Sequence, residues 1–572
     1  MLLEKDVIIS FENFGFQYTA QAEPTLYDIN LNIRKGEKVL IAGPSGCGKS
    51  TLAHCINGLI PASYEGKSTG KLTVAGQDAQ ALGLFGLSKI VGTVLQDSDG
   101  QFIGLTVAED IAFSLENDCV ERAEMHQKVR ETARVVGVEQ VLHHAPHEIS
   151  GGQKQRVSLG GVMVGQVDVL LFDEPLANLD PATGKQTIQL IDEIQQRTGC
   201  AVVIIEHRLE DVLYRKVDRV VVMNEGRICY DGDPDALLCS NLLQESGIRE
   251  PLYITALKYA KVQLKPEMHP AFLPQLQLTE QHKEQVRRWF YSQPLPQPKP
   301  EAPVLLQVEG LDFTYDKGTH ALKDISLTIR KGEMLSIVGT NGAGKSTFSK
   351  AVCGFVTPQK GKITLGDTDL STLSIKERGD RIGYVMQNPN QMICETQIFD
   401  EVALGLRNRG INEAQVKARV EATLKICGLY PFRKWPVSAL SYGQKKRVTI
   451  ASILVMAPDI ILLDEPTAGQ DFAHYTEIME FLRDLNQKGV TVVLITHDMH
   501  LMLEYTPRAV VFHDGRIVAD KTAAEVLNAP DIVEQANLKE TSLYHLALEC
   551  GIDDPEAFTR RFIAEDQEVR AR

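Results

Sequence analysis

The sequence predicts an α/β protein with two similar domains in tandem, each with a mostly parallel sheet, and three observations support this prediction. The segment Ile33–Glu37 recurs as Ile329–Glu333, and Phe172–Pro175 is matched by Leu463–Pro466. In both copies a short apolar run leads into a glycine-rich loop and then into helix-forming residues. In both copies a second apolar run ends in two acidic residues. Repeats this far apart indicate duplicated domains, and the strand–loop–helix order is typical of parallel sheets.

The repeat also predicts the domain boundaries. We expect four segments: a first domain at 1–262, a linker at 263–303, a second domain at 304–556 and a polar C-terminal tail at 557–572. Within the linker, Thr279 is expected to cap a short helix from Glu280 to Trp289, because a hydroxyl followed by polar helix formers is a helix start signal. The prolines between 294 and 303 predict an extended, semi-rigid spacer.

Composition narrows the class of protein. The 572-residue chain is 43% hydrophobic and 24% charged, which is typical of folded domains. Its net charge of −15 argues against a nucleic-acid partner. The ten cysteines include no CxxC pair, so we expect reduced thiols and no zinc site. The chain has no run of about 18 apolar residues and no signal peptide, so we expect a cytosolic protein that reaches a membrane through a partner.

Both glycine-rich loops fit the phosphate-binding pattern GxxxxGK[ST]. The first copy has Gly43, Pro44, Ser45, Gly46, Cys47, Gly48, Lys49, Ser50 and Thr51, and the second has Gly339, Thr340, Asn341, Gly342, Ala343, Gly344, Lys345, Ser346 and Thr347. Glycines let backbone N–H groups point at phosphate oxygens, and the following helix presents its positive end to them. We therefore predict two ATP sites. Lys49 and Lys345 are expected to neutralise the β- and γ-phosphates, and the serine that follows each lysine is expected to bind Mg²⁺.

The two acidic pairs are Asp173-Glu174 and Asp464-Glu465. A buried strand that ends in acids places them at the carboxyl edge of a parallel sheet, where ligands bind. We predict that each aspartate holds Mg²⁺, usually through water. Each glutamate is expected to orient or deprotonate the attacking water.

These motifs and several others in the same order resemble the ATP-binding cassette (ABC) family over nearly the whole length of both copies. The signature sequence of that family is matched by Ser150, Gly151, Gly152 and Gln153 and by Ser441, Tyr442, Gly443 and Gln444. Further positions are matched in both copies: the Q-loop glutamine by Gln96 and Gln387, the switch histidine by His207 and His497, and the adenine-stacking aromatic residue by Tyr18 and Tyr315.

The resemblance implies a fold and a mechanism. Each cassette of this family combines a parallel core with an antiparallel β region and a helical subdomain that carries the signature. Two cassettes close head to tail around two ATP molecules, so that each ATP contacts the phosphate loop of one cassette and the signature of the other. Gln96 and Gln387 would contact Mg²⁺, and both would take part in hydrolysis with the switch histidines. Tyr442 replaces a glycine, which either slows closure of one site or, if the ring points outward, changes nothing.

A narrower resemblance is to the ATPases of energy-coupling factor (ECF) transporters, which drive uptake of vitamins and metal ions. The segment Gln96–Phe102 followed by Thr106–Phe113 resembles the Q-loop region of that group, and Gln387–Gln391 followed by Asp400–Ala403 is similar. The resemblance implies two partners at the cytoplasmic face of the membrane. One is a transmembrane scaffold subunit, and the other is a small membrane protein that binds the substrate.

Three other functions stay open at this stage. A fused ATPase of a sugar importer typically has a degenerate second phosphate loop, whereas Gly344-Lys345-Ser346 is intact. A double-cassette translation or repair factor often has a long charged helical linker, whereas this linker is rich in proline. An exporter ATPase has the same chemistry, because the direction of transport is set by the membrane partner.

Overall fold

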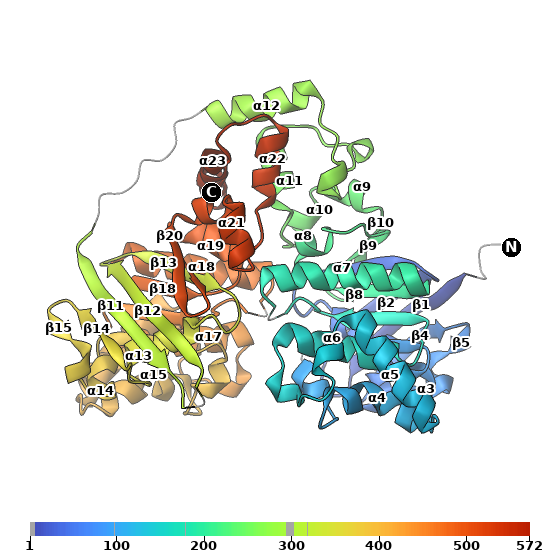
Figure 1. Cartoon of the computed structure of the whole chain (residues 1–572), viewed down its shortest axis with the longest axis horizontal. Helices are drawn as coiled ribbons and strands as arrows, with labels where there is room; N and C mark the ends of the chain where they lie inside the picture. Colours follow the sequence, from blue (N-terminus) through green and yellow to red (C-terminus); the bar gives the residue numbers. More distant parts are fainter. Residues whose placement is uncertain are drawn as a thin grey trace. The chain divides into compact units, whose positions relative to one another are not determined.

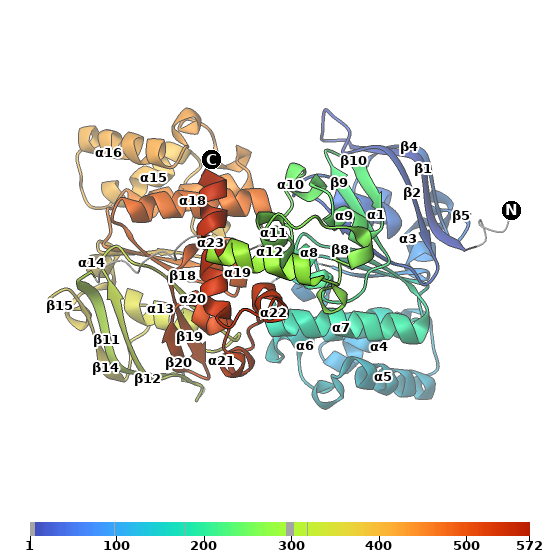
Figure 2. The same ribbon diagram turned by 90° about the horizontal axis from the view of Figure 1, so that it is seen from above.

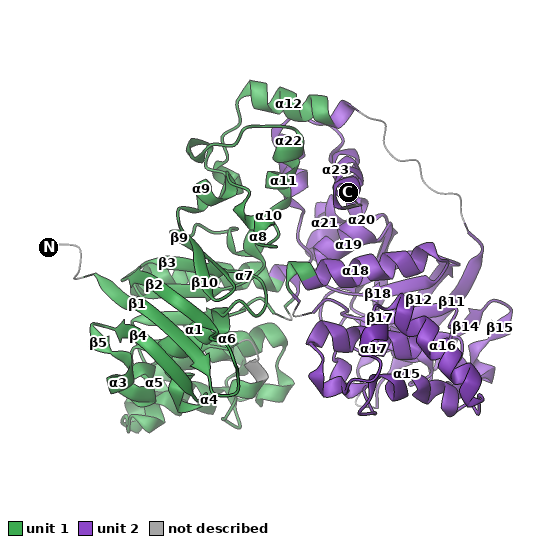
Figure 3. Cartoon of the chain, turned by 180° about the vertical axis from the view of Figure 1, so that it is seen from behind, with its two compact units in different colours: residues 1–179, 183–289, 471–473 green, residues 180–182, 290–470, 474–572 purple. Residues whose placement is uncertain are grey.

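The computed structural model describes residues 6–95, 98–177, 179–292, 302–316, 318–468 and 470–571. The chain divides into two compact units (Figure 3): unit 1 holds residues 1–179, 183–289 and 471–473, and unit 2 holds residues 180–182, 290–470 and 474–572. Within the described residues each unit has one six-stranded and one four-stranded sheet (Figure 1). The predicted tandem α/β fold is confirmed.

The six-stranded sheet of unit 1 has the order β10-β9-β3-β8-β7-β6, and all neighbours pair in parallel except β10 with β9. Its strands are β3 (Lys38–Ala42), β6 (Val91–Val94), β7 (Val169–Asp173), β8 (Ala201–Ile205), β9 (Arg219–Asn224) and β10 (Arg227–Gly232). Strands β3, β7 and β8 are buried along their whole length, because a parallel sheet is covered on both faces. The antiparallel sheet, in the order β2-β1-β4-β5, contains β1 (Val7–Tyr18), β2 (Leu26–Arg34), β4 (Gly66–Val74) and β5 (Gln77–Asp78).

Unit 2 repeats this plan. Its mostly parallel sheet, in the order β16-β17-β18-β13-β19-β20, contains β13 (Met334–Gly339), β16 (Ile382–Val385), β17 (Ile460–Asp464), β18 (Thr491–Ile495), β19 (Arg508–His513) and β20 (Arg516–Lys521). Its antiparallel sheet, in the order β12-β11-β14-β15, contains β11 (Val304–Thr314), β12 (His320–Arg330), β14 (Lys360–Leu365) and β15 (Thr368–Asp369). The antiparallel β region that the ABC resemblance implied is thus present in both copies.

The helices of the first half of the chain are α1 (Lys49–Ile56), α2 (Leu59–Ala62), α3 (Ala79–Ser88), α4 (Val107–Asn117), α5 (Arg122–Val136), α6 (Gly151–Met163), α7 (Pro181–Thr198), α8 (Leu209–Val212), α9 (Pro234–Leu238), α10 (Leu242–Glu245), α11 (Leu252–Tyr259) and α12 (Glu280–Tyr291). Those of the second half are α13 (Lys345–Cys353), α14 (Ile375–Gly379), α15 (Ile398–Arg407), α16 (Glu413–Ile426), α17 (Tyr442–Leu454), α18 (Phe472–Gln487), α19 (Met499–Tyr505), α20 (Ala523–Leu527), α21 (Pro530–Gln535), α22 (Ser542–Glu549) and α23 (Pro555–Ala571).

Three helices in each unit pack against one another and form the helical subdomain (Figure 2). These are α4, α5 and α6 in unit 1, labelled in Figure 2, and α15, α16 and α17 in unit 2, labelled in Figure 3. In unit 2 the subdomain has its own apolar core, to which Val402, Val416 and Val448 each contribute a fully buried side chain. Among the described residues, no helix has both the length and the apolar character needed to cross a bilayer.

The segment at 263–289, expected to belong to a linker, packs within unit 1. Tyr253 Oη donates to the carbonyl oxygen of Pro270 at 2.5 Å, and Val286 is fully buried. The predicted helix is confirmed, and Thr279 Oγ1 accepts from the backbone amide of His282 at 3.3 Å, as a helix cap does. The linker prolines at 294–300 lie outside the described residues.

The polar tail expected at 557–572 differs from the structure as well. Residues 557–571 form most of α23, and both Phe558 and Phe562 are buried. The two phenylalanines are four residues apart and so lie on one face of the helix, which explains why a segment rich in charge still packs.

Two candidate nucleotide sites

Each phosphate loop joins a buried strand to a helix. In unit 1 β3 leads through the loop into α1, and in unit 2 β13 leads into α13. Gly48 and Gly344, the residues just before the helices, have left-handed φ angles of 102° and 101°. A Cβ atom on Gly344 would lie 2.4 Å from the carbonyl oxygen of Ala321. Glycine is therefore required at this turn for its backbone conformation and for space.

The two loop lysines are buried under their own loops. Lys49 Nζ donates to the carbonyl oxygens of Gly43 at 2.7 Å and Pro44 at 2.8 Å. Lys345 makes the same two bonds to the equivalent carbonyls of its loop, at 2.8 and 2.9 Å. Each ammonium group thus lies where a phosphate bound to the loop amides would meet it.

The predicted adenine-stacking tyrosines lie beside the loops. Tyr18 Oη is 3.0 Å from Thr51 Oγ1, and Tyr315 Oη is 3.1 Å from Thr347 Oγ1. Both threonines end the phosphate-binding pattern and lie in the first turn of the helix, so the structure brings each tyrosine to the start of that helix. Stacking on adenine stays a prediction.

The predicted Mg²⁺ ligands lie together in both units. Ser50 Oγ donates to Asp173 Oδ1 at 3.3 Å, and Ser346 Oγ donates to Asp464 Oδ2 at 3.4 Å. Burial, and then the neighbouring Glu174, raise the pKa of Asp173 to about 6, and burial also raises the pKa of Asp464. Hydroxyl and carboxylate oxygens are the ligands that Mg²⁺ prefers, and a raised carboxylate pKa means that a cation placed there would be favourable. The residues therefore fit Mg²⁺.

Both candidate catalytic glutamates have a strained backbone. Their φ angles are 49° for Glu174 and 44° for Glu465, in the left-handed region that non-glycine residues rarely adopt. Each amide donates to the end of the neighbouring strand, to Ile205 O at 2.9 Å and to Ile495 O at 2.8 Å. Such strain costs about 1–3 kcal/mol and tends to gather at functional sites. Its presence at the same residue of both copies supports a functional reason.

Each switch histidine lies beside the glutamate of its own unit. His497 Nδ1 is 2.7 Å from Glu465 Oε1, and Thr496 Oγ1 donates to Glu465 Oε2 at 3.2 Å. In unit 1 the corresponding distance, from His207 Nδ1 to Glu174 Oε1, is 3.7 Å. The acid and histidine are therefore held together more closely in unit 2.

A further carboxylate, which the sequence analysis missed, lies beside the histidine of unit 1. Glu206 is fully buried, and His207 Nδ1 is 3.3 Å from its Oε1 atom. The carboxylate accepts the backbone amides of His207 at 2.9 Å, Arg208 at 3.2 Å and Leu176 at 3.3 Å. The signal in the sequence was that the residue before the switch histidine differs between the copies, glutamate in one and Thr496 in the other.

Replacing Glu206 with glutamine is expected to lower the pKa of His207. Burial lowers this pKa, but the nearby Glu206 and then Glu174 outweigh burial and hold it above its ordinary value. Removing one buried negative charge should shift the pKa of His207 down. NMR titration of Cε1-labelled histidines in the full chain measures this, with His207 assigned from a His207→Gln sample. The control is His54, whose pKa is lowered by burial and should be the same in both proteins. An unchanged pKa of His207 would refute the effect.

The signature residues begin the third helix of each helical subdomain. Ser150 Oγ accepts from the amide of Gln153, and Gln153 Oε1 accepts from the amide of Ser150 at 2.9 Å. Ser441 and Gln444 form the same capping box at the start of α17. This reciprocal capping leaves the amides of the intervening residues at the positive end of the helix. Contact of the signatures with ATP stays a prediction.

Tyr442, which replaces a glycine of the signature, is the first residue of α17, and its effect on closure of one site stays a prediction. Its ring is 42% exposed, yet its hydroxyl donates to the carbonyl oxygen of Gln387 at 3.3 Å. Gln387 follows β16, which pairs in parallel with β17, so it leaves the sheet at the same edge as Asp464. Gln96 lies outside the described residues, and its role at the first Mg²⁺ stays a prediction.

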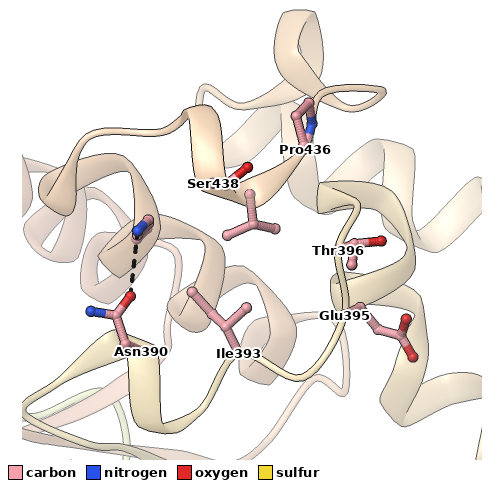
Figure 4. A pocket seen from close by; sticks show the side chains of 8 residues that line it. Asn390, Ile393, Glu395, Thr396, Pro436 and Ser438 are labelled. Carbon is pink, nitrogen blue, oxygen red and sulfur yellow. Dashed lines mark hydrogen bonds between the residues drawn. The ribbon is translucent and has the colours of Figure 1, made fainter. Parts of the chain in front are cut away.

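A pocket of about 320 Å³ lies beside the segment that follows Gln387 in unit 2 (Figure 4). One wall comes from the segment after Gln387, and the other from the turn that precedes the signature. It is lined by Asn390, Ile393, Glu395, Thr396, Pro436, Val437, Ser438 and Lys445. Lys445 Nζ donates to Asn390 Oδ1 at 3.4 Å and so joins the first wall to the signature helix α17.

Two phosphate loops, each with an acid-ended strand and a histidine at the same sheet edge, define a chain with two P-loop ATPase cassettes. The family model described as ABC transporter matches residues 26–177 and 322–468. The chain belongs to the ABC transporter family, and it is an ATPase whose hydrolysis of ATP is coupled to transport. A second model, described as an ATP-binding cassette cobalt transporter, matches 240–313, and a third, for an AAA domain, matches the shorter range 433–504.

Relatives of full length carry the same family name. The chain is 57% identical to an ABC transporter ATP-binding protein of Clostridium perfringens and 58% identical to one of Enterococcus faecalis, over 99% of this chain and 100% of each relative. Among solved structures, cbiO1 from Clostridium perfringens, described as part of the ABC transporter complex cbiONQ, is 34% identical with a TM-score of 0.39, over 43% of this chain and 99% of that one. The predicted family and double cassette are confirmed, and the cobalt-transporter match agrees with the narrower resemblance to ECF-type ATPases.

Proposed function

We propose that this chain is the energy-coupling ATPase of an ECF-type importer for a vitamin or another micronutrient. The observation that carries the proposal is the match of residues 240–313 to a cobalt transporter model, in the stretch that joins the two cassettes. Its partners are a transmembrane scaffold subunit and a small membrane protein that binds the substrate. With these partners it works at the cytoplasmic face of the membrane.

In this proposal the two cassettes form an intramolecular dimer that closes head to tail around two ATP molecules. The loop at 43–51 faces the signature at 441–444, and the loop at 339–347 faces the signature at 150–153. Helix-start amides aimed at the γ-phosphate make closure depend on the triphosphate, and hydrolysis removes that contact. The free energy passed to the membrane partner is set by how much more tightly the closed state of the two cassettes binds ATP than the open state does.

Each site uses its own residues in the same way. Mg²⁺, held by the loop serine, the strand-end aspartate and the Q-loop glutamine, supplies positive charge to the phosphates. Glu174 and Glu465 orient the attacking water and accept its proton. The switch histidines hold these glutamates in position from the neighbouring strand end, at the distances given above.

The pocket of Figure 4 is proposed to receive a short helix of the scaffold subunit. Ile393, Pro436 and Val437 supply apolar lining, and Glu395 and Lys445 supply charges that fix the orientation of the occupant. An amphipathic helix laid into such a groove buries its apolar face. Because the pocket adjoins the segment that carries Gln387, a movement of that helix reaches the nucleotide site directly.

Co-purification in mild detergent tests the proposed function. We expect two membrane proteins to accompany the chain, one of them small and very apolar. Copurification with ribosomal proteins would instead support a translation factor, and a pair of larger membrane subunits with no small component would support another type of ABC transporter.

The two sites are expected to contribute unequally. Glu465→Gln should lower steady-state ATP hydrolysis by the membrane complex more than Glu174→Gln does. Glu465 is held by both His497 and Thr496, whereas the site of Glu174 faces the signature that contains Tyr442 in the proposed dimer. Equal losses would show that these differences are neutral, and a larger loss from Glu174→Gln would reverse the order.

A further inference from the structure

The segment that carries Gln387 is tied to the signature helix α17 of its own unit. Lys446 Nζ donates to the carbonyl oxygens of Met386 and Gln387, both at 2.8 Å. Tyr442 Oη donates to the same Gln387 oxygen at 3.3 Å. One backbone carbonyl therefore accepts from two side chains that lie on the same helix.

Burial of the Lys446 ammonium group costs free energy, which its hydrogen bonds must offset. Lys446 is only 1% exposed, and burying an ammonium group is unfavourable unless it is paired and hydrogen-bonded. Charge-assisted bonds are shorter and stronger than neutral ones, and the two 2.8 Å distances are of this kind. The backbone at 386–387 is thus held by two charge-assisted bonds.

Tyr442 and Lys446 both differ from the residues at the corresponding positions of the first copy. The corresponding positions there are Gly151, which has no side chain, and Gln155. Gln155 Nε2 donates to the carbonyl oxygen of Pro175, and its Oε1 accepts from Thr187 Oγ1 at 3.2 Å. Among the described residues, this helix position contacts the loop after the acid-ended strand in unit 1 and the Q-loop segment in unit 2.

We propose that Tyr442 and Lys446 are positioning residues that hold Gln387 ready for Mg²⁺ and water and make the signature helix move together with the Q-loop segment. Fixing the backbone in advance lowers the entropy cost of ordering the glutamine when Mg-ATP binds. The proposal rests on the proposed function in one respect, the assignment of Gln387 to the metal site. The bonds that hold the segment do not depend on that assignment.

Hydrogen–deuterium exchange on the nucleotide-free full chain tests the positioning. The amides of Met392 and Ile393 donate back to Pro389 O within the loop, so their exchange reports how often the loop opens. Tyr442→Phe, which removes only a hydroxyl, and Lys446→Gln, which installs the residue of the first copy, should each speed exchange in peptides covering 386–393, by about tenfold for the lysine. Lys417→Gln, at an exposed position of the same unit, is the matched control and should change nothing.

Unchanged exchange in both variants would overturn the proposal. Faster exchange throughout unit 2 in Lys446→Gln would mean that Lys446 supports the whole fold, and it would overturn the role of that residue. In that case the exchange measured in Tyr442→Phe still tests the role of Tyr442, because this ring is half-exposed.

A second readout follows Mg²⁺. In titrations with a fluorescent ATP analogue, both variants should reduce the gain in affinity that Mg²⁺ gives, several-fold. Gln387→Ala should have the same effect. If only Gln387→Ala acts, the two residues do not position the glutamine. If Gln387→Ala has no effect either, the assignment of Gln387 is wrong, which is a failure of the proposed function that the exchange result does not share.

Discussion

Replacing both Glu174 and Glu465 with glutamine is expected to slow ATP hydrolysis by about 10²–10⁴-fold while ATP still binds. Glutamine keeps the shape of the side chain, but it has one accepting oxygen in place of two and cannot accept the proton of the attacking water. The strained backbone at both residues and the adjacent histidines should persist, because neither depends on the charge alone. Single-turnover hydrolysis of labelled ATP measures the chemical step, and retained nucleotide measures binding.

Two exposed glutamates provide matched controls for that experiment. Glu116→Gln and Glu534→Gln make the same chemical change in each half of the chain, at positions far from the phosphate loops in sequence. Both should hydrolyse ATP at the parental rate. Parental hydrolysis by the Glu174→Gln, Glu465→Gln double variant would show that these carboxylates are not the catalytic bases.

The parts of the site that the sequence predicts are those defined by local order along the chain. A phosphate loop needs its glycines, lysine and serine at fixed spacing, since one turn of backbone surrounds the phosphates. The acid pairs follow apolar runs directly, and parallel pairing then brings Asp173 and Asp464 to their serines. Local pattern and sheet topology together were sufficient for these contacts.

Contacts made only by tertiary packing could not be predicted in this way. Lys446 was an ordinary helix residue in the sequence, and only the packing of α17 against the loop after β16 buries it. Glu206 was one residue in an apolar strand end, and its three backbone partners come from two different segments. Comparing the two copies position by position would have found both, because each differs from its counterpart.

The predicted boundaries at 263 and 557 differ from the structure for a related reason. The segment at 263–289 has no helical or strand periodicity before the helix predicted from Glu280, and it resembles a linker until the bond from Tyr253 to Pro270 and the burial of Val286 are seen. The last helix is rich in charge, and the spacing of Phe558 and Phe562 was the one sign that it packs. Apolar residues scattered through a polar segment predict burial only when the surface that receives them is known.

Removing the two loop lysines is expected to weaken ATP binding strongly. Lys49→Ala with Lys345→Ala should lower affinity for a fluorescent ATP analogue by on the order of 10–100-fold at each site, since each change deletes a charge-assisted contact to phosphate. These lysines also bond to their own loop carbonyls, so their loss also loosens the loop. Lys71→Ala and Lys360→Ala, at exposed positions in the two halves, control for loss of charge. Affinity for ATP should fall more than affinity for AMP, which carries no β- or γ-phosphate for the lysine to contact. Equal losses for both nucleotides would mean that the loops had lost their shape, and an unchanged ATP affinity in the double variant would show that these loops are not the ATP sites.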